Sequence, residues 1–287
     1  AYGGLAVGLL LWWKWPSYVV AATAVALAFL LPLPKAGGVD VGPPPGLRVT
    51  VLDVGQGDAI LLQPAAAPAV LIDGGPPGAG LIRKLEDENV ESLGAAVVTH
   101  DQSDHAGGVE ELLGAFPVER LLFARLGRDL IASAAAAGVQ PERIAAGREL
   151  RSGRLRLRVL WPPPELLGGA SRGADPNQLA LVMEARWWDF TMLLTADAEA
   201  EAAPLDPGPV DVLKIAHHGS EDAGLGELLV QTRPQLAVIS VGEENPYGHP
   251  TAATLAALER HRIRTLRTDV EGTIEIEVGR TWMRVDG

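Results

Sequence analysis

The sequence of 287 residues contains no cysteine. This absence excludes disulfide bonds, thiolate zinc sites and a cysteine nucleophile. A metal ion would have to be bound by histidine, aspartate or glutamate. Hydrophobic residues make up 47% and charged residues 21% of the chain, so we expect most of it to form one large domain or two ordinary ones.

The chain also lacks an excess of positive charge, since its formal net charge is −12. A protein that wraps nucleic acid with its whole surface is excluded, because contacts to phosphates depend on Lys and Arg. Two segments differ from this average: residues 147–160 contain five arginines and residues 260–267 contain four. Arg154, Arg156 and Arg158 alternate, so a strand would place them on one face. That face is either simply solvated or a strip that faces phosphates.

The first 34 residues have almost no charge, because Lys14 is the only charged residue before Lys35. The apolar run over 17–34 is at the short end of what spans a bilayer. A secretory signal would need a basic start and a small-residue cleavage site, and a buried core helix is seldom apolar all round. We therefore interpret residues 1–34 as an apolar helix at the end of a membrane region, in what is expected to be a longer protein.

Three segments of different composition follow one another along the chain. After the apolar region, residues 35–46 are rich in glycine and proline, which is typical of a linker. From residue 47 to 287, short β-branched runs alternate with turn residues and a few helical stretches. The predicted strands are 48–54, 59–64, 69–75, 95–100, 120–125, 154–162, 179–185, 189–197, 210–218, 236–242 and 272–279, and the predicted helices are 108–116, 128–139 and 250–261. Two strand-rich halves of this kind predict an α/β sandwich.

A cluster of histidine and aspartate occurs in VVTHDQSDHAGG, residues 97–108. A predicted strand ends at His100, and Asp104 and His105 follow a short polar turn. Ligands at the end of a strand and the start of a helix have a fixed separation, as divalent ions require. The two glycines allow the backbone to turn sharply beside an ion. Taken alone, this loop could equally be a solvated turn.

Further potential ligands end other predicted strands or lie in turns. Asp197 follows one strand, His217 and His218 follow another, and His249 lies in the turn before the last predicted helix. Five of the six histidines therefore fall in three such places. This distribution favours a metal site built from segments that are distant in the sequence.

Six motifs occur in a fixed order along the chain. They are LDVGQGDAILL (52–62), LIDGG (71–75), THDQSDHAGG (99–108), LLTAD (193–197), LKIAHHGS (213–220) and YGHP (247–250). In this order they resemble the metallo-β-lactamase-fold domain of the ComEC family, the membrane channel of bacterial DNA uptake in natural competence. The resemblance covers roughly residues 47–285. It implies a four-layer αββα sandwich with a site for one or two metal ions at the sheet edge.

The resemblance also implies a set of metal ligands. The fold's general motif, HxHxDH, falls on His100, Gln102, Asp104 and His105, so a neutral glutamine replaces the second histidine. Asn177, also neutral, stands where a later ligand of the same metal position is expected. One position is therefore depleted. The implied metal ligands are His100, Asp104, His105, Asp197 and His217.

The second metal position is expected to be intact, with Asp197 as a possible bridge and one ligand from His217, His218 or His249. An oxygen-rich set of this kind favours Mn²⁺, with Zn²⁺ or Mg²⁺ as alternatives. The proposed catalytic residues are His218, His249, Lys214 and Asp104. A histidine that does not bind metal would protonate the departing oxygen, and Lys214 would bind phosphate unless it is simply solvated.

Supporting residues are expected in two loops. Asp73 resembles the fold's aspartate that orients a ligand histidine, although a turn aspartate before two glycines is an equal alternative. The loop DVGQGD contains Asp53, Gln56 and Asp58 and either brings backbone N–H groups to an anion or forms a tight hairpin.

Three functions remain open at this point. The first is a metal-dependent phosphodiesterase that acts on DNA, most simply single-stranded, and degrades the strand that is not transported. Its partners would be the membrane and other competence proteins, and the hydrolase domain would lie outside the cytoplasm at the cell membrane. The second is hydrolysis of a lactone, ester or β-lactam, and the third is an inactive domain that binds DNA or a protein partner.

Overall fold

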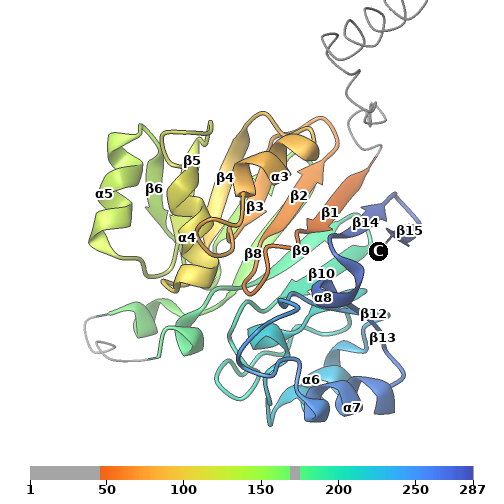
Figure 1. Ribbon diagram of the computed structural model, residues 1–287. Coiled ribbons are helices and arrows are strands. Elements are labelled where there is room, and N and C mark those ends of the chain that lie inside the picture. The colour runs from red at the N-terminus through yellow and green to blue at the C-terminus, as the bar shows by residue number, and fades with distance from the viewer. Residues whose placement is uncertain (1–45, 169–174, 287) are drawn as a thin grey trace, which may run out of the picture. The chain divides into compact units, whose positions relative to one another are not determined.

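The computed structural model describes residues 46–168 and 175–286 (Figure 1). These residues belong to a compact unit that spans Pro43–Gly287. The predicted apolar helix over 1–34 lies outside the described residues, as does the predicted linker up to residue 45. Within the described part of the chain, no helix has the length and apolar character needed to cross a membrane.

Two sheets form the centre of the described unit. The first has the order β15 (Met283–Asp286), β14 (Ile274–Val278), β1 (Leu47–Val51), β2 (Ile60–Pro64), β3 (Ala69–Ile72), β4 (Leu93–Val98), β5 (Arg120–Phe123) and β6 (Gln140–Arg143). The second has the order β13 (Arg264–Arg267), β12 (Leu236–Ile239), β11 (Val212–Lys214), β10 (Phe190–Leu194), β9 (Val182–Trp187), β8 (Leu155–Trp161) and β7 (Glu149–Ser152). Strands β3 to β6 pair in parallel, and so do β10 to β13.

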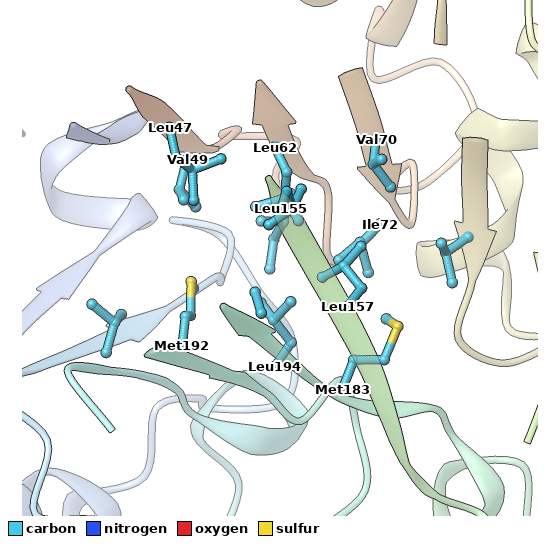
Figure 2. Packing of buried hydrophobic residues seen from close by; sticks show 14 of the residues in the cluster. Leu47, Val49, Leu62, Val70, Ile72, Leu155, Leu157, Met183, Met192 and Leu194 are labelled. Atoms are coloured by element: carbon cyan, nitrogen blue, oxygen red, sulfur yellow. The ribbon is translucent and has the colours of Figure 1, made fainter. Parts of the chain in front are cut away.

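The inner faces of the two sheets pack against each other (Figure 2). Val49 and Leu62 of the first sheet belong to the same buried cluster as Leu157 and Met192 of the second. In β8 the alternation is simple: Leu155, Leu157 and Val159 point inward and are buried, whereas the arginines between them are exposed. Strands β1 to β4 are buried at every position, as expected where both faces of a sheet are covered.

Helices cover the outer faces and complete four layers. Helices α3 (Leu81–Asp87), α4 (Ser103–Leu112) and α5 (Arg128–Ala136) belong to the clusters on the first sheet, and α6 (Leu225–Thr232) and α7 (Ala252–Arg260) to the cluster on the second. Short elements complete the described unit: α8 (Thr268–Glu271) and the 3₁₀ turns η1 (Pro164–Leu167), η3 (Asn177–Leu179) and η4 (Ala216–Gly219).

Helix α4 begins earlier than predicted, because it starts at Ser103 and not near residue 108. The prediction that AGG precedes this helix is therefore wrong. Gly107 and Gly108 lie inside it, where they permit close packing: a Cβ at Gly108 would lie 2.0 Å from the carbonyl oxygen of Gly74. Asp104 occupies the first helical turn, where a carboxylate interacts favourably with the helix dipole.

Candidate metal centre

The candidate site lies where strands of both sheets end. His100 follows β4, Asp197 follows β10, and His218 lies in η4 after β11. His105 is in the first turn of α4. Strand ends and a helix start therefore bring together side chains that are up to 118 positions apart, from 100 to 218.

Asp73 fixes the orientation of the first two histidines. His105 Nδ1 donates to Asp73 Oδ2 over 2.8 Å, and the Thr99 hydroxyl donates to the same oxygen over 2.7 Å. Since the Thr99 proton is used in this way, its oxygen accepts from His100 Nδ1 at 3.0 Å. Both rings thereby turn their Nε2 atoms toward Asp197, at 3.3 Å for His105 and 3.8 Å for His100. The carboxylate of Asp73 thus orients both rings through their Nδ1 atoms, directly for His105 and through Thr99 for His100.

The two rings differ in charge. Burial disfavours the charged form of His105, but the carboxylates of Asp197 and Asp73 outweigh burial and hold its pKa well above the ordinary value. Burial and the neighbouring His105 lower the pKa of His100 to about 4. Burial would raise the pKa of Asp197, but His105, His218 and Lys214 hold it well below its usual range. The centre thus pairs buried carboxylates with buried imidazoles.

His218 and His217 point in different directions. His218 is almost fully buried and donates from Nδ1 to the carbonyl oxygen of Ser240 at 2.8 Å. Its Nε2 faces Asp104 at 3.5 Å and Asp197 at 3.7 Å. Both histidines have positive φ angles, 48° and 54°, so neighbouring side chains leave the turn in different directions. His218 is therefore the member of the pair that enters the centre.

His217 lies at the rim, with 31% of its side chain exposed. Its Nδ1 donates to Glu199 at 2.9 Å, and the Ser220 hydroxyl donates to the same carboxylate at 2.6 Å. The hydrogen bond to Glu199 raises the pKa of His217, although burial opposes the shift. The Nε2 atom of His217 is 4.0 Å from Asp197.

Lys214 is fully buried and is not solvated. Its ammonium group forms an ion pair with Asp58 and donates to the carbonyl oxygen of Ala196 at 2.9 Å. Burial would raise the pKa of Asp58, but Lys214 and His218 outweigh burial and lower it. With its donors engaged beneath Asp197, Lys214 is not placed to contact a phosphate that enters from solvent.

The two neutral residues of the depleted position lie together. Gln102 donates from its side-chain nitrogen to the Asn177 amide oxygen over 2.6 Å, and the Asn177 amide nitrogen is 3.3 Å from His217 Nε2. The residues that stand in place of the expected imidazoles thus bind one another, and His217 lies next to them.

The predicted loop 53–58 lies against the site but contributes unequally. Asp53 accepts from the Gly55 backbone and shapes the turn, and Gln56 accepts from the Gly242 backbone. Only Asp58 reaches the centre, 3.4 Å from His218 Nδ1. Gly57 is required here because a Cβ would lie 2.1 Å from the Asp104 carbonyl oxygen, at a φ of 131°.

His249 lies next to the rim and not among the buried residues. Its ring centroid is 5.6 Å from that of His217, and it stacks with Tyr247, an exposed side chain, at 5.9 Å. Asn245 binds both the N–H and the carbonyl group of His249 and so fixes its backbone. Burial and the neighbouring His217 lower the pKa of His249, so the ring is neutral near pH 7.

Several functional residues were not identified from the sequence. Glu199 follows Asp197 by two positions and Thr99 precedes His100, so both had a signal in their spacing. Ser240 acts through its backbone carbonyl group, which carries no sequence signal at all.

A divalent metal ion fits the buried atoms of this centre. The Nε2 atoms of His100, His105 and His218, together with Asp197 Oδ1, are buried and have no hydrogen-bond partner. Two groups of ligand atoms lie within 4.8 Å of one another: His100, His105 and Asp197, and Asp104, His105 and His218. Buried polar atoms without partners are costly, and bound metal would satisfy these atoms, with release of the protons of charged imidazoles. A pocket of about 310 Å³, whose lining includes Asn177, Asp197, Glu199 and His217, opens beside them.

Known proteins are similar to this chain in sequence and in fold. The family model described as the metallo-beta-lactamase superfamily matches residues 52–168. The chain is 32% identical over 286 residues to ComE operon protein 3 of Bacillus subtilis, an alignment that covers 89% of this chain and 35% of that protein. It is 28% identical over 300 residues to Competence protein ComA of Neisseria gonorrhoeae, covering 92% of this chain and 40% of that protein. The chain thus spans well under half the length of these curated relatives.

A solved structure supports the same conclusion on the fold. YhfI from Bacillus subtilis, described as a metallo-beta-lactamase fold protein, has a TM-score of 0.51 and 12% identity, and the match covers 77% of this chain and 96% of YhfI. At this identity the likeness shows the fold alone. The predicted metallo-β-lactamase fold is confirmed.

Proposed function

Because the chain belongs to the ComEC family and has the metallo-β-lactamase fold, we propose that it is a metal-dependent phosphodiesterase that cleaves DNA. In competence this activity would degrade the strand that is not transported. The domain would then act at the cell membrane, on its extracytoplasmic side, together with other competence proteins. The convergence of unpartnered buried Nε2 atoms on Asp197 is the observation that supports the proposal most directly.

The proposed primary metal ligands are Asp104, His105, Asp197 and His218. His218 takes the place given to His217 at first, because only its Nε2 faces Asp104 and Asp197 at the buried centre. His100 is the remaining imidazole on the side of the depleted position. The four ligands are two carboxylates and two imidazoles. Because carboxylates suit Mn²⁺, we favour this ion, with Zn²⁺ and Mg²⁺ as the alternatives.

Bound at this centre, a divalent cation lowers the pKa of water and offsets the charge of a phosphate. The residues of the chain then have separate tasks. Asp73 and Ser240 hold His105 and His218 in the tautomers that present Nε2. Lys214 neutralises Asp58 at the buried side of the centre. We therefore assign Lys214 a positioning role and not a contact with substrate.

His217 is the proposed proton donor to the departing oxygen. It borders the open pocket, and its hydrogen bond to Glu199 raises its pKa and so favours the form that can donate a proton. His249 is neutral and lies beside it, next to the exposed ring of Tyr247. This arrangement places a general acid at the solvent side of the centre and the ligands at the buried side.

The test is metal analysis combined with nuclease assays on the purified chain. We expect cleavage of single-stranded DNA with Mn²⁺ supplied. Asp104→Asn should reduce bound metal and lower cleavage by more than about 100-fold, since even residues behind a ligand commonly contribute 10- to 100-fold. Asp101→Asn, an exposed aspartate three positions away, is the matched control and should leave both unchanged.

Two alternatives give different outcomes in the same assays. Turnover of a lactone, ester or β-lactam without any cleavage of DNA would identify a carbonyl hydrolase. The pairing of Gln102 with Asn177, in place of two imidazoles, argues against that reaction. Binding of DNA without turnover of any substrate, in metal-loaded protein, would identify an inactive binding domain.

A further inference from the structure

An uncovered row of arginines crosses the outer face of the second sheet. Arg156 of β8 lies directly opposite Arg151 of β7 on one side and Arg186 of β9 on the other. Arg158 lies on the same face of β8, two residues further on, and all four side chains are exposed. These four residues are called the arginine face.

Like charges opposite each other on neighbouring strands destabilise a sheet, so this row has a cost. Neighbouring carboxylates offset only part of the repulsion between these arginines. Glu149 pairs with Arg151 at 2.6 Å, and the buried Glu184 is shared by Arg158 and Arg186. Arg156 has no carboxylate partner among the described residues. The face therefore has an excess of positive charge in a chain whose net charge is −12.

An aromatic platform lies at one end of this face. Trp188, in the turn between β9 and β10, is 43% exposed and has a φ of 55°, unusual for a large side chain. The guanidinium carbon of Arg154 lies 3.8 Å from the centroid of the indole ring, and that of Arg280 lies 4.6 Å from it. An exposed indole with two guanidinium groups near its ring thus lies at the surface, next to the first residues of β8.

The chemistry of this surface fits a single-stranded nucleic acid. Guanidinium groups bind phosphates through paired hydrogen bonds, and bases stack on aromatic rings and on guanidinium planes. Single-strand binding proteins combine a cationic track with such stacking residues.

Strand β8 connects the arginine face to the metal centre. It runs from Leu155 to Trp161, roughly 20 Å at about 3.3 Å per residue. At its end, the Trp161 indole donates to the carbonyl oxygen of Gln178, the residue after Asn177 at the rim of the site. A strand bound along β8 would therefore lead to the pocket beside His217.

We propose that the arginine face and Trp188 bind single-stranded DNA outside the metal centre. The identity of the ligand rests on the proposed function, whereas the location of the binding surface rests on the register of β7, β8 and β9. The acidic rim at Asp175 and Glu199 repels phosphate, so affinity for a long strand comes from this distant face.

The test is fluorescence anisotropy with a labelled thymidine oligonucleotide of about 20 nucleotides, longer than the track on β8. The full chain carries Asp104→Asn and a chelator is present, so the probe is not cut. Substitution of Arg151 and Arg156 by Gln should weaken binding at least about 10-fold. It should also reduce the salt slope by about 1.4, because each phosphate neutralised on a single strand adds about 0.7 to that slope. Trp188→Ala should weaken binding about 5-fold or more.

Arg264→Gln, an exposed arginine on β13 at the other edge of the same sheet, is the matched control and should bind as the starting chain does. Equal affinity and salt slope in the double variant and this control would overturn the proposal. The proposal would also be overturned if the double variant lost binding to phosphatidylglycerol vesicles while it retained binding to the oligonucleotide.

Cleavage of a small diester, bis(p-nitrophenyl) phosphate, separates this inference from the proposed function. In a chain with Asp104 intact, the double variant should cleave the small diester at an unchanged rate but show a raised KM for the oligonucleotide. If the unsubstituted chain cleaves neither compound, the proposed function fails, and the anisotropy result still decides whether the arginine face binds DNA.

Discussion

At the scale of single residues, the histidine pair 217–218 determines how the centre is built. His218 is buried with Nε2 directed at Asp104 and Asp197, whereas His217 is bound to Glu199 at the rim. We expect His218→Ala to lower metal affinity at least 10-fold, because a ligand is removed. His217→Ala should retain the metal but lose turnover, and isothermal titration with Mn²⁺ beside rate measurements would distinguish the two. Equal loss of metal in both variants would contradict this assignment.

The charge of His218 makes the stability of the metal-free chain depend on pH. Burial opposes protonation, but Asp197, Asp104 and Asp58 outweigh burial and raise its pKa to about 9 from 6.5. A raised pKa stabilises the fold fully below pH 6.5, and that stabilisation is lost as pH rises from 6.5 to about 9. The loss is of the order of 3 kcal/mol.

Thermal unfolding in the presence of a chelator, at about pH 6 and about pH 9, measures this effect. The midpoint should be lower at the higher pH. Because the pKa of His105 is also raised, His218→Gln should reduce the difference without removing it. His261→Gln, which changes an exposed histidine after α7, should leave the pH difference unchanged. An identical pH response in the two variants would show that His218 does not carry the effect.

The residue scale also shows what the sequence could and could not indicate. Strand ends predicted the positions of His100, Asp104, His105 and Asp197, because strand ends follow from apolar periodicity. The choice between His217 and His218 depends on two left-handed backbone conformations, which no periodicity encodes. The burial of Lys214 depends on Asp58, 156 positions earlier in the chain, and such a pairing is invisible to local patterns.

At the scale of elements, helix α4 is held by its close approach to two loops. Gly108 N–H donates to the Gly75 carbonyl oxygen at 2.9 Å, and Asp58 N–H donates to that of Asp104 at 3.2 Å. Gly108→Ala would place a Cβ 2.0 Å from the Gly74 carbonyl oxygen, so α4 would have to move. We expect a loss of about 1–3 kcal/mol in the free energy of unfolding, together with weaker metal binding.

Gly226→Ala in α6 is the matched control for this prediction. Nothing lies within 4 Å of a Cβ at that position, so helix propensity alone should stabilise the chain by up to about 1 kcal/mol. Urea denaturation and metal titration of both variants give the comparison. If Gly108→Ala behaved like the control, the packing of α4 would not limit the site.

The strands missed in the sequence have a common physical cause. Strand β6, Gln140–Arg143, contains a proline and is mostly exposed, so it lacks the apolar alternation by which strands are predicted. Strand β6 is an edge strand of its sheet, a position where proline is tolerated. Strands β7, β13 and β15 lie at or next to sheet edges as well, and their pairing partners, not their own composition, make them strands.

At the scale of the whole molecule, the candidate metal centre lies between the two halves of the sandwich. Asp104 and His105 come from the helix on the first sheet, and Asp197 and His218 from loops of the second. A ligand that binds only the folded chain stabilises it, by about 2.7 kcal/mol at 100 times its Kd. We expect Mn²⁺ to raise the midpoint of thermal unfolding and a chelator to reverse this, and Asp104→Asn should abolish the shift. A shift of equal size in that variant would mean that the ion binds elsewhere.

The predicted sandwich of two sheets could be derived because each half of the chain contains short apolar, β-branched runs separated by turn residues. The way the halves meet could not, since it depends on side chains that fill the space between the sheets, such as Leu157 and Met192. The arginine face shows the same limit. The alternation of Arg156 and Arg158 was visible in the sequence, but their alignment with Arg151 and Arg186 required the register.

Strand β1 lies between β2 and β14, and its residue Val49 pairs with Ile276 near the other end of the chain. During synthesis, a ribosome must therefore release almost the whole domain before this strand can acquire its second neighbour. Until then the nascent polypeptide exposes an unpaired apolar edge, LRVTV, to other chains. Incomplete chains are therefore more prone to aggregate than the finished domain, in which β14 covers this edge.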